Sequence, residues 1–371
     1  MLSVSSYYKR TVALYAGSFD PISNGHLWIV RQALKNFDHV VLAIGVNPDK
    51  KTTFTVEERK DMIEKSLLNL PVSVEIVEKQ FIANYCRDNQ IKTMIRGIRN
   101  VKDLEYEQSI QAINERINSS LQTIYFIPPS ELAGVSSSMV KSLINESEWQ
   151  FVVKDLVPEV VMQDLMILKY KKAASNMFYS FMLNGLGISP ESYTSACIKW
   201  EKKLLTEYSS PKRYYHNWQH ILEMYNCGNQ QWNGDFVAAI LFHDVVYDVN
   251  AKNNEERSAQ LFEECVGEIM SSFPDLNKKP HLDEELVKKL ILTTQNHQGS
   301  MNEKINAFID ADLFIFAESK KRVFEYERQI RQEYIHVPDN IYKTERIKIL
   351  QSFLNRPYVY LTSFVAESPM L

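Results

Sequence analysis

Over its first 130 residues or so, the chain alternates apolar runs of strand length with segments of helical periodicity. Five runs predict strands, at residues 11–16, 39–46, 72–77, 91–95 and 121–127. The run at 39–46 is apolar throughout, which is typical of a parallel strand buried on both faces. Between the runs lie amphipathic helical segments, one of which opens with a capping box at Thr55–Glu58. This alternation predicts a doubly wound α/β fold whose ligands bind at the carboxyl ends of the strands.

The pattern changes in the second half of the chain. There, helical segments with aromatic and aliphatic stripes follow one another with few strand-like runs, which predicts an all-α domain. We place the two domains at residues 1–170 and 171–371. No proline- or glycine-rich linker marks the join, and Lys171–Ser175 is the expected junction, where one helix could run on.

Composition narrows the class of protein. The 371 residues carry a net charge of −4, so no basic field indicates nucleic-acid binding. The four cysteines are scattered, which is typical of reduced thiols. Residues 1–10 lack the apolar core of a signal peptide, and no apolar run is long enough to cross a bilayer. We therefore expect a cytoplasmic protein that binds neither nucleic acid nor membrane.

The loop Gly17–His26 joins the first predicted strand to the first predicted helix. It places His26 in the first turn of that helix, where free N–H groups and the helix dipole favour phosphate. A histidine there can donate a hydrogen bond to a phosphoryl oxygen as charge builds on it. Taken alone, the same residues would also suit a tight turn with a solvated histidine.

Three further motifs follow predicted strands or begin predicted helices. Lys50 follows the second strand, Arg96-Gly97-Ile98-Arg99 ends the fourth, and Ser136-Ser137-Ser138 precedes a helix. Each has an ordinary explanation as a solvated basic turn or a helix cap. Asp103–Glu107 likewise suits an acidic helix start. Their common position at one end of an α/β domain favours a shared site.

Together these motifs resemble the HIGH-type nucleotidyltransferase superfamily, and within it the phosphopantetheine adenylyltransferase family. The matching patterns are G-x-F-D-P-x-x-x-G-H, R-G-[LI]-R, D-[FL]-E-Y-E and I-S-S-[ST]. The resemblance implies transfer of the adenylyl group of ATP to 4′-phosphopantetheine with Mg²⁺, which gives dephospho-coenzyme A and pyrophosphate. It also implies a homo-oligomer, namely a hexamer.

The resemblance assigns roles to individual residues. The implied catalytic residues are His26, Lys50 and Arg99. The implied ATP-binding residues are Ser18, Phe19, His26, Gly97, Arg99, Glu107, Ser136, Ser137 and Ser138. The implied acceptor-binding residues are Ser18, Lys50, Ile82 and Arg96, although Ile82 suits an apolar core equally well. The sequence departs from the family at Ser18, where threonine is frequent, and in the loop 130–134, which lacks the usual aromatic residue.

Histidines and carboxylates mark the second domain. His216 and His220 are four residues apart, and we expect them on one face of a helix. His243 and Asp244 end an apolar helix that starts near Phe236. Burying a histidine beside a carboxylate is costly unless a metal or a partner compensates. The pair therefore favours a divalent Mg, Mn, Fe, Co, Ni or Zn site.

The order His…His-Asp…Asp resembles the HD-domain phosphohydrolase superfamily. The resemblance implies His220, His243, Asp244 and Asp312 as metal ligands, with Asp310 as the substitute for Asp312. It implies His216 as the group that protonates the leaving oxygen. His297 is a candidate for a second metal or for phosphate binding. Glu255 is a candidate for ordering a metal-bound water, although a solvated charge run suits it at least as well. The implied fold is an HD domain, and its substrate stays open.

The sequence thus favours an adenylyltransferase joined to a metal-dependent phosphohydrolase. Two alternatives keep part of this interpretation. In the first, the HD domain is a regulatory module that uses its metal for sensing. In the second, the transferase uses another acceptor, such as nicotinate mononucleotide or glycerol phosphate. A non-enzymatic interaction protein would need both sites to be vestigial.

Overall fold

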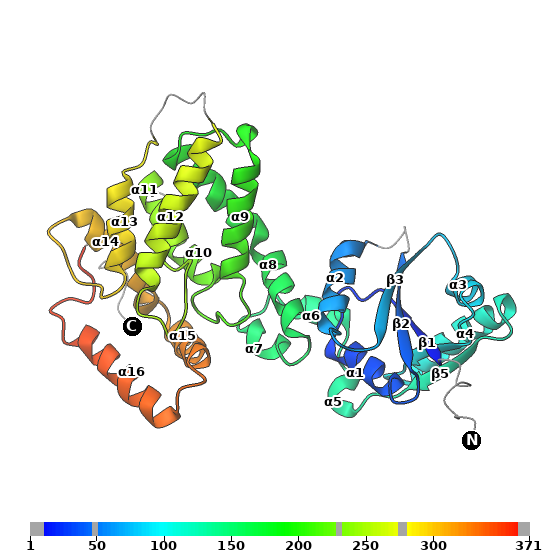
Figure 1. Ribbon diagram of the computed structural model, residues 1–371. Coiled ribbons are helices and arrows are strands. Elements are labelled where there is room, and N and C mark those ends of the chain that lie inside the picture. The colour runs from blue at the N-terminus through cyan, green and yellow to red at the C-terminus, as the bar shows by residue number, and fades with distance from the viewer. Residues whose placement is uncertain (1–10, 47–50, 228–231, 274–279, 363–371) are drawn as a thin grey trace, which may run out of the picture. The chain divides into compact units, whose positions relative to one another are not determined.

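The computed structural model describes residues 11–46, 51–227, 232–273 and 280–362 (Figure 1). The chain forms two compact units, called unit 1 (residues 1–165) and unit 2 (residues 166–371). The division falls inside helix α8 (Glu159–Ser180), which contains the expected junction Lys171–Ser175. No helix in the described ranges combines the length and apolar character needed to cross a membrane.

Unit 1 is built on a five-stranded parallel sheet of order β3-β2-β1-β4-β5. The strands are β1 (Val12–Gly17), β2 (His39–Val46), β3 (Val72–Glu78), β4 (Thr93–Gly97) and β5 (Gln122–Phe126). Strand β1 pairs with β2 on one side and with β4 on the other, so the strand order reverses beside it. In doubly wound sheets, ligands bind at this reversal, outside the carboxyl ends of the strands.

Helices cover both faces of the sheet (Figure 1). They are α1 (Asn24–Ala33), α2 (Val56–Ser66), α3 (Ile82–Asp88), α4 (Val101–Ile117), α5 (Ser130–Ala133), α6 (Ser137–Leu143) and α7 (Trp149–Val153). One face packs Leu14, Val41 and Met94 against α3 and the end of α4. The capping box expected at Thr55 is present, because Thr55 and Glu58 bond to each other's backbone N–H. The Rossmann-like architecture predicted from the alternating pattern is confirmed for unit 1.

Among its described residues, unit 2 contains helices and the segments that connect them, and no strand. After α8 come η2 (Phe181–Gly185), η3 (Pro190–Ser192), α9 (Ser195–Tyr208), α10 (Trp218–Cys227), α11 (Gly234–Phe242), α12 (Asn254–Ser271), α13 (Glu284–Thr293), α14 (Glu303–Asp312), η4 (Leu313–Ala317), α15 (Lys320–Glu333) and α16 (Asp339–Leu354). Every residue of α11 is buried, so this helix is the centre of a large apolar core. His243 and Asp244 follow directly after α11, and the next residue, Val245, still belongs to this core.

Candidate functional site

A cleft of about 300 Å³ opens at the carboxyl ends of β1 and β4 in unit 1. It brings together ten residues assigned from the sequence: Ser18, Phe19, His26, Arg96, Gly97, Arg99, Glu107, Ser136, Ser137 and Ser138. Lys50 lies outside the described residues. Ile82 does not line this cleft, because it packs on the apolar core beneath α3. The sequence motifs therefore converge on one cavity, apart from these two residues.

A hydrogen bond from the backbone sets the tautomer of His26. The N–H of Ser23 donates to His26 Nδ1 at 3.1 Å, and the Ser23 hydroxyl lies 2.9 Å from the same nitrogen. Because a backbone N–H can only donate, Nδ1 must carry a lone pair, and the ring proton lies on Nε2. Burial, together with the charges of Arg99 and Arg96, lowers the pKa of His26 to about 4. His26 is therefore a neutral N–H donor at neutral pH.

The loop before His26 is held by a buried carboxylate. Asp20 accepts hydrogen bonds from Phe54 N at 2.9 Å and from Lys141 Nζ at 2.6 Å. Burial alone would raise the pKa of Asp20, but these donors outweigh it and lower the pKa below its usual value. The ring of Phe19 packs edge-on against His26 and Tyr15, with centroids 5.2 and 5.3 Å away. Ionised Asp20 thus fixes the loop Gly17–His26 to the segment at Phe54 and to Lys141 of α6.

Two arginines at the end of β4 face different partners. Arg96 makes a bidentate pair with Glu107, at 2.6 and 2.5 Å, and also donates to the carbonyl of Ala16. Arg99 pairs with Asp103 at 2.7 Å and is more exposed. The Arg96 fork is therefore occupied by Glu107, whereas Arg99 keeps an exposed part of its guanidinium toward solvent.

Close packing against Ile29 explains why position 97 is a glycine. A Cβ built at Gly97 would lie 2.3 Å from Cδ1 of Ile29 on α1, so a larger residue would displace that side chain, which also lines the cleft. Across the cleft, Ser136 caps α6 by accepting from Met139 N, and Ser137 donates to the carbonyl of Pro21. Helix α6 therefore starts against the loop that carries His26.

Some residues that line or support this cleft were given no role in the sequence analysis. Tyr15 lines it, and burial raises the pKa of its hydroxyl so that it stays protonated. Ser23 was detectable, since its spacing of three residues from His26 is that of a capping box. Asp20 is part of the Gly17–His26 motif, but the sequence analysis assigned it no role. The pairing of Asp20 with Lys141, 121 residues away, has no sequence signal.

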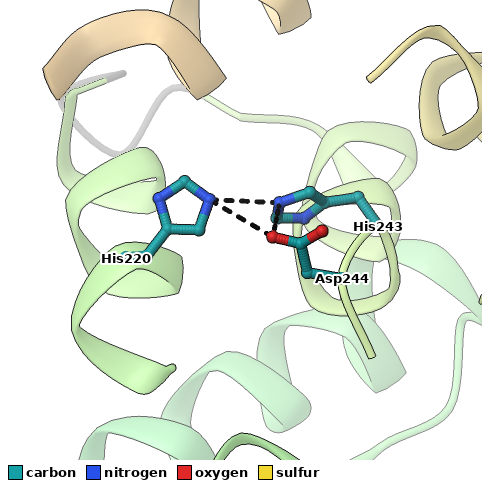
Figure 2. A group of neighbouring side chains, drawn as sticks. All are labelled: His220, His243 and Asp244. Carbon is teal, nitrogen blue, oxygen red and sulfur yellow. Dashed lines mark hydrogen bonds and ion pairs between the residues drawn. The ribbon is translucent and has the colours of Figure 1, made fainter. Parts of the chain in front are cut away.

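In unit 2, His220, His243 and Asp244 form a group that could hold a metal ion (Figure 2). The two Nε2 atoms are 3.2 Å apart, and Asp244 Oδ2 lies 3.1 Å from His243 Nε2 and 3.7 Å from His220 Nε2. Both histidines are almost completely buried. The Nδ1 of His243 faces the carbonyl of Ile240 at 3.0 Å, which leaves Nε2 with the lone pair in the neutral ring.

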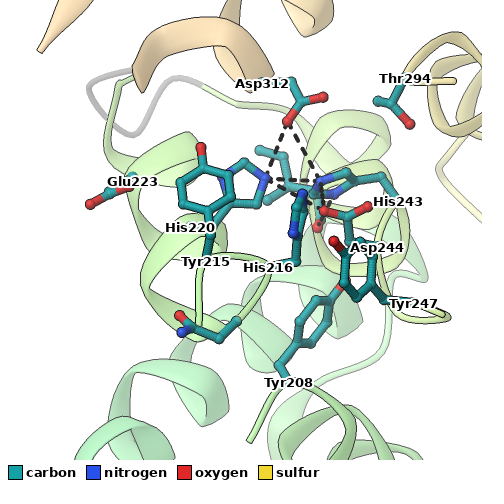
Figure 3. A network of polar contacts seen from close by, with 12 residues as sticks. Tyr208, Tyr215, His216, His220, Glu223, His243, Asp244, Tyr247, Thr294 and Asp312 are labelled. Atoms are coloured by element: carbon teal, nitrogen blue, oxygen red, sulfur yellow. Dashed lines mark hydrogen bonds and ion pairs between the residues drawn. The ribbon is translucent and has the colours of Figure 1, made fainter. Parts of the chain in front are cut away.

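Asp312 closes this group from the end of α14 (Figure 3). Its Oδ1 is 3.1 Å from His220 Nε2 and 3.8 Å from His243 Nε2, while Oδ2 pairs with His297 Nε2 at 2.8 Å. The substitute, Asp310, faces elsewhere, because it accepts hydrogen bonds from the backbone N–H groups of Leu361 and Thr362. The structure thus brings Asp312, and not Asp310, to the two histidines.

The four side chains fit a divalent cation. Donor atoms that share one ion at about 2.0–2.2 Å lie about 3 Å apart. Three donor pairs here are separated by 3.1–3.2 Å, whereas the Asp244–His220 and Asp312–His243 pairs are separated by 3.7 and 3.8 Å. Two imidazoles with two carboxylates suit Mn, Fe, Co, Ni or Zn, and Mg less well. Burial would lower the pKa of His243, yet the attraction of Asp244 and Asp312 raises it to about 9. The carboxylates thus create a buried site that favours positive charge.

The expectation that His216 and His220 share a helix face is wrong. Helix α10 begins at Trp218, and His216 lies in the turn before it. The cause is Asn217, whose side-chain oxygen accepts the N–H of Gln219 and so caps the helix. His216 still lies beside the group, stacked on Tyr247 with ring centroids 4.2 Å apart.

Glu333, which sequence reasoning missed, orients His216. Its Oε2 lies 2.7 Å from His216 Nδ1 and accepts from the Tyr247 hydroxyl at 2.9 Å. Its Oε1 accepts the backbone N–H groups of Tyr214, Tyr215 and His216. Burial would lower the pKa of His216, but the Glu333 carboxylate outweighs it and raises that pKa. Nδ1 therefore donates to Glu333, and no sequence signal linked residues 117 positions apart.

Comparison with known proteins bears on unit 1. The cytidylyltransferase-like family profile matches residues 14–143. A phosphopantetheine adenylyltransferase of Chromobacterium violaceum is 41% identical over 155 residues, which is 42% of this chain and 94% of the relative. One of Nautilia profundicola is 38% identical over 42% of this chain and 99% of its own length. Among solved structures, a nicotinic acid mononucleotide adenylyltransferase of Plasmodium falciparum is 14% identical, with a TM-score of 0.35 over 44% of this chain and 97% of that one.

Proposed function

Through unit 1 the chain belongs to the phosphopantetheine adenylyltransferase family, and from this we propose that unit 1 transfers the adenylyl group of ATP to 4′-phosphopantetheine. The products would be dephospho-coenzyme A and pyrophosphate. The observation that carries the proposal is the 41% identity to a relative that is matched over 94% of its length. The cleft supports it, since both signature motifs line one cavity.

In the proposed reaction, an oxygen of the acceptor phosphate forms a bond to the α-phosphorus of ATP. The bond from that phosphorus to the bridging oxygen breaks, and pyrophosphate leaves with the electron pair. The attacking phosphate is already anionic, so no side chain need act as a strong base. Positioning and charge stabilisation then account for the rate.

The residues of the cleft suit these tasks. His26 would donate its Nε2 proton in a hydrogen bond to a phosphoryl oxygen as negative charge grows there. The N-terminal amides of α1 and α6, with Ser136–Ser138, would bind the terminal phosphates of ATP, and Arg99 would add a cation. Lys50 is proposed to follow the transferred group. Mg²⁺ is expected to enter with the ATP phosphates and to neutralise part of their charge.

An acceptor screen tests this proposal. We expect purified full-length protein with ATP and Mg²⁺ to release pyrophosphate with 4′-phosphopantetheine, and not with nicotinate mononucleotide or glycerol phosphate. A His26→Ala variant should lose about 10²–10³-fold in kcat, the usual effect of removing one transition-state donor. Comparable turnover of nicotinate mononucleotide would favour the other-acceptor alternative instead.

We further propose that unit 2 is an HD-type metal-dependent phosphohydrolase, with His220, His243, Asp244 and Asp312 holding the ion. When bound, a divalent ion supplies a Lewis acid for a phosphoryl group and lowers the pKa of water. His216, held by Glu333, would donate a proton to the leaving oxygen. The specific observation that favours this activity is the buried two-histidine, two-carboxylate group beside an oriented histidine.

A regulatory module that binds a metal without turnover is the alternative for unit 2. Phosphate release separates the two, measured with Mn²⁺ on phosphopantetheine, dephospho-coenzyme A, pyrophosphate and nucleotides. A hydrolase should release phosphate in the wild type and not in Asp244→Ala. Bound metal without release from any ester would favour the regulatory alternative.

A further inference from the structure

A cavity of about 590 Å³ lies directly beside the proposed metal ligands of unit 2. Asp312, His216 and His297 form part of its lining. A molecule that reacts at the His220–His243–Asp244–Asp312 group would therefore place its remaining atoms in this cavity. Its size is typical of a site for a small organic molecule.

One wall of the cavity is a compact apolar cluster. Tyr215, Ile315, Tyr326 and Ile330 are buried together and line the cavity. Phe316 and Tyr334 pack against them and line it as well, and so does Tyr342 of α16. Rings and branched aliphatic side chains here offer surface to an apolar group, and the tyrosines add hydroxyl groups.

Helix α16 provides further lining and has no buried residue. Figure 1 shows this helix in orange-red near the C-terminus. Ile341, Ile349 and Phe353 line the cavity from one face of this helix, at spacings of four and eight residues. Ile341 is 51% exposed and Ile349 is 47% exposed, so protein atoms cover only half of these side chains. The lining is thus mainly apolar on both sides, although Glu345, Arg346 and Ser352 of α16 also line the cavity.

Arg356, in the segment after α16, is one of the charged residues that line the cavity. Arg356 donates to the carbonyls of His297 and Asn296 and lies over the ring of Phe353. Among the described residues no carboxylate lies within ion-pair distance of it. Arg346, in contrast, is paired with Glu327 at 2.6 Å. Arg356 is therefore the cation that this cavity can offer to a phosphate held near His297 and Asp312.

We propose that unit 2 acts on phosphate monoesters of apolar alcohols, with the phosphate between the metal ligands and Arg356 and the apolar group between α16 and the Tyr326–Ile330 cluster. This inference rests on the phosphohydrolase proposed above. In the reaction, the oxygen of water bonds to phosphorus and the ester P–O bond breaks. The alcohol leaves with a proton from His216, the proton that the water loses restores His216, and inorganic phosphate is the other product.

Three esters of primary alcohols test the selection, because glycerol, the most acidic leaving group of the three, belongs to the ester expected to react most slowly. We expect kcat/KM with Mn²⁺ to rise from glycerol 3-phosphate to propyl phosphate and again to 3-phenylpropyl phosphate. The rise should be about fourfold for each methylene equivalent that is buried. Hydrolysis of all three at similar rates would overturn the proposal and leave the phosphohydrolase standing.

Matched variants on and after α16 test whether this part of the cavity causes the preference among the three esters. Ile349→Ser should lower the preference for 3-phenylpropyl over propyl phosphate about three- to tenfold. Ile347→Ser should not, since Ile347 is 53% exposed on the same helix but outside the cavity lining. Arg356→Gln should raise KM for all three esters about tenfold or more, whereas Lys343→Gln, exposed outside the lining, should not. Equal effects of Ile349→Ser and Ile347→Ser would contradict the assigned wall.

A binding measurement separates this inference from hydrolysis. 3-Phenylpropylphosphonate has a P–C bond and cannot be hydrolysed, so calorimetry reports its affinity for the Mn²⁺-loaded full chain. We expect binding that Ile349→Ser and Arg356→Gln both weaken. If the phosphonate binds in this way but no ester is hydrolysed, the proposed phosphohydrolase activity would be wrong. The proposal that the cavity binds phosphates with an apolar group would then still hold. No binding, or binding insensitive to both variants, would overturn the ligand class itself.

Discussion

At the scale of single residues, the two nitrogens of His26 have different tasks. Nδ1 accepts the N–H of Ser23, and Nε2 carries the proton that can face a phosphate. An asparagine places its amide near the position of Nδ1, whereas a glutamine reaches the position of Nε2. We therefore expect His26→Gln to keep more adenylyl transfer than His26→Asn, which should lose about 10²–10³-fold in kcat. Steady-state pyrophosphate release from both variants checks this, and equal losses would contradict the assigned tautomer.

The low pKa of His26 makes the stability of unit 1 depend on pH. Burial and the two arginines lower its pKa from 6.5 to about 4, so the folded state resists protonation more than the unfolded state does. Between these values the unfolded chain binds the extra proton, and the stability of unit 1 falls as pH decreases from 6.5 to 4. Denaturant unfolding at several pH values should show a smaller acid loss in His26→Gln. A His26-dependent loss centred above pH 6.5 would contradict this sign.

At the scale of elements, the N-terminus of α11 approaches η2 closely. A Cβ at Gly234 would lie 2.5 Å from the backbone carbonyl oxygen of Asn184, and backbone atoms cannot move aside as a side-chain end can. We expect Gly234→Ala to destabilise unit 2 by about 1–3 kcal/mol through overpacking. Gly267→Ala is the matched control, since Gly267 lies in α12 with no atom within 4 Å of its added Cβ. The control should stabilise by about 0.5–1 kcal/mol, and denaturant midpoints of both variants check the pair.

The sequence predicted helices, strands and the loops between them better than it predicted contacts between distant residues. The five strands were predicted within about two residues, because each is a local apolar run between turn signals. The loop of His26 and the start of α6 were predicted for the same reason, since motif, strand end and helix start are neighbours along the chain. The start of α10 was missed, because the cap made by Asn217 competes with the helical spacing of His216 and His220. Glu333 could not have been found, since only the tertiary fold brings α15 to the turn at His216.

At the scale of the whole molecule, each unit has its own apolar core and its own candidate ligand site. The core around Leu14 and Met94 belongs to unit 1, and the core around α11 belongs to unit 2. A ligand stabilises the unit that binds it, by about 2.7 kcal/mol at one hundred times its Kd. For a unit of this size that corresponds to roughly 5–10 °C in Tm. We therefore expect Mn²⁺ to raise one thermal transition of the full chain and ATP to raise another.

Crossed variants decide whether those shifts belong to the assigned sites. Asp244→Ala should abolish the Mn²⁺ shift and leave adenylyl transfer unchanged, because Asp244 stands in unit 2 among the proposed metal ligands. His26→Ala should do the reverse, by removing transfer while the Mn²⁺ shift persists. Calorimetry of the two variants beside the wild type, with bound metal measured on the same samples, gives all four readings. If Asp244→Ala kept the Mn²⁺ shift, the ion would bind elsewhere, and the proposed hydrolase would lose its site. If Asp244→Ala instead removed adenylyl transfer, the two chemistries would be coupled, and the separation of the cores would not extend to function.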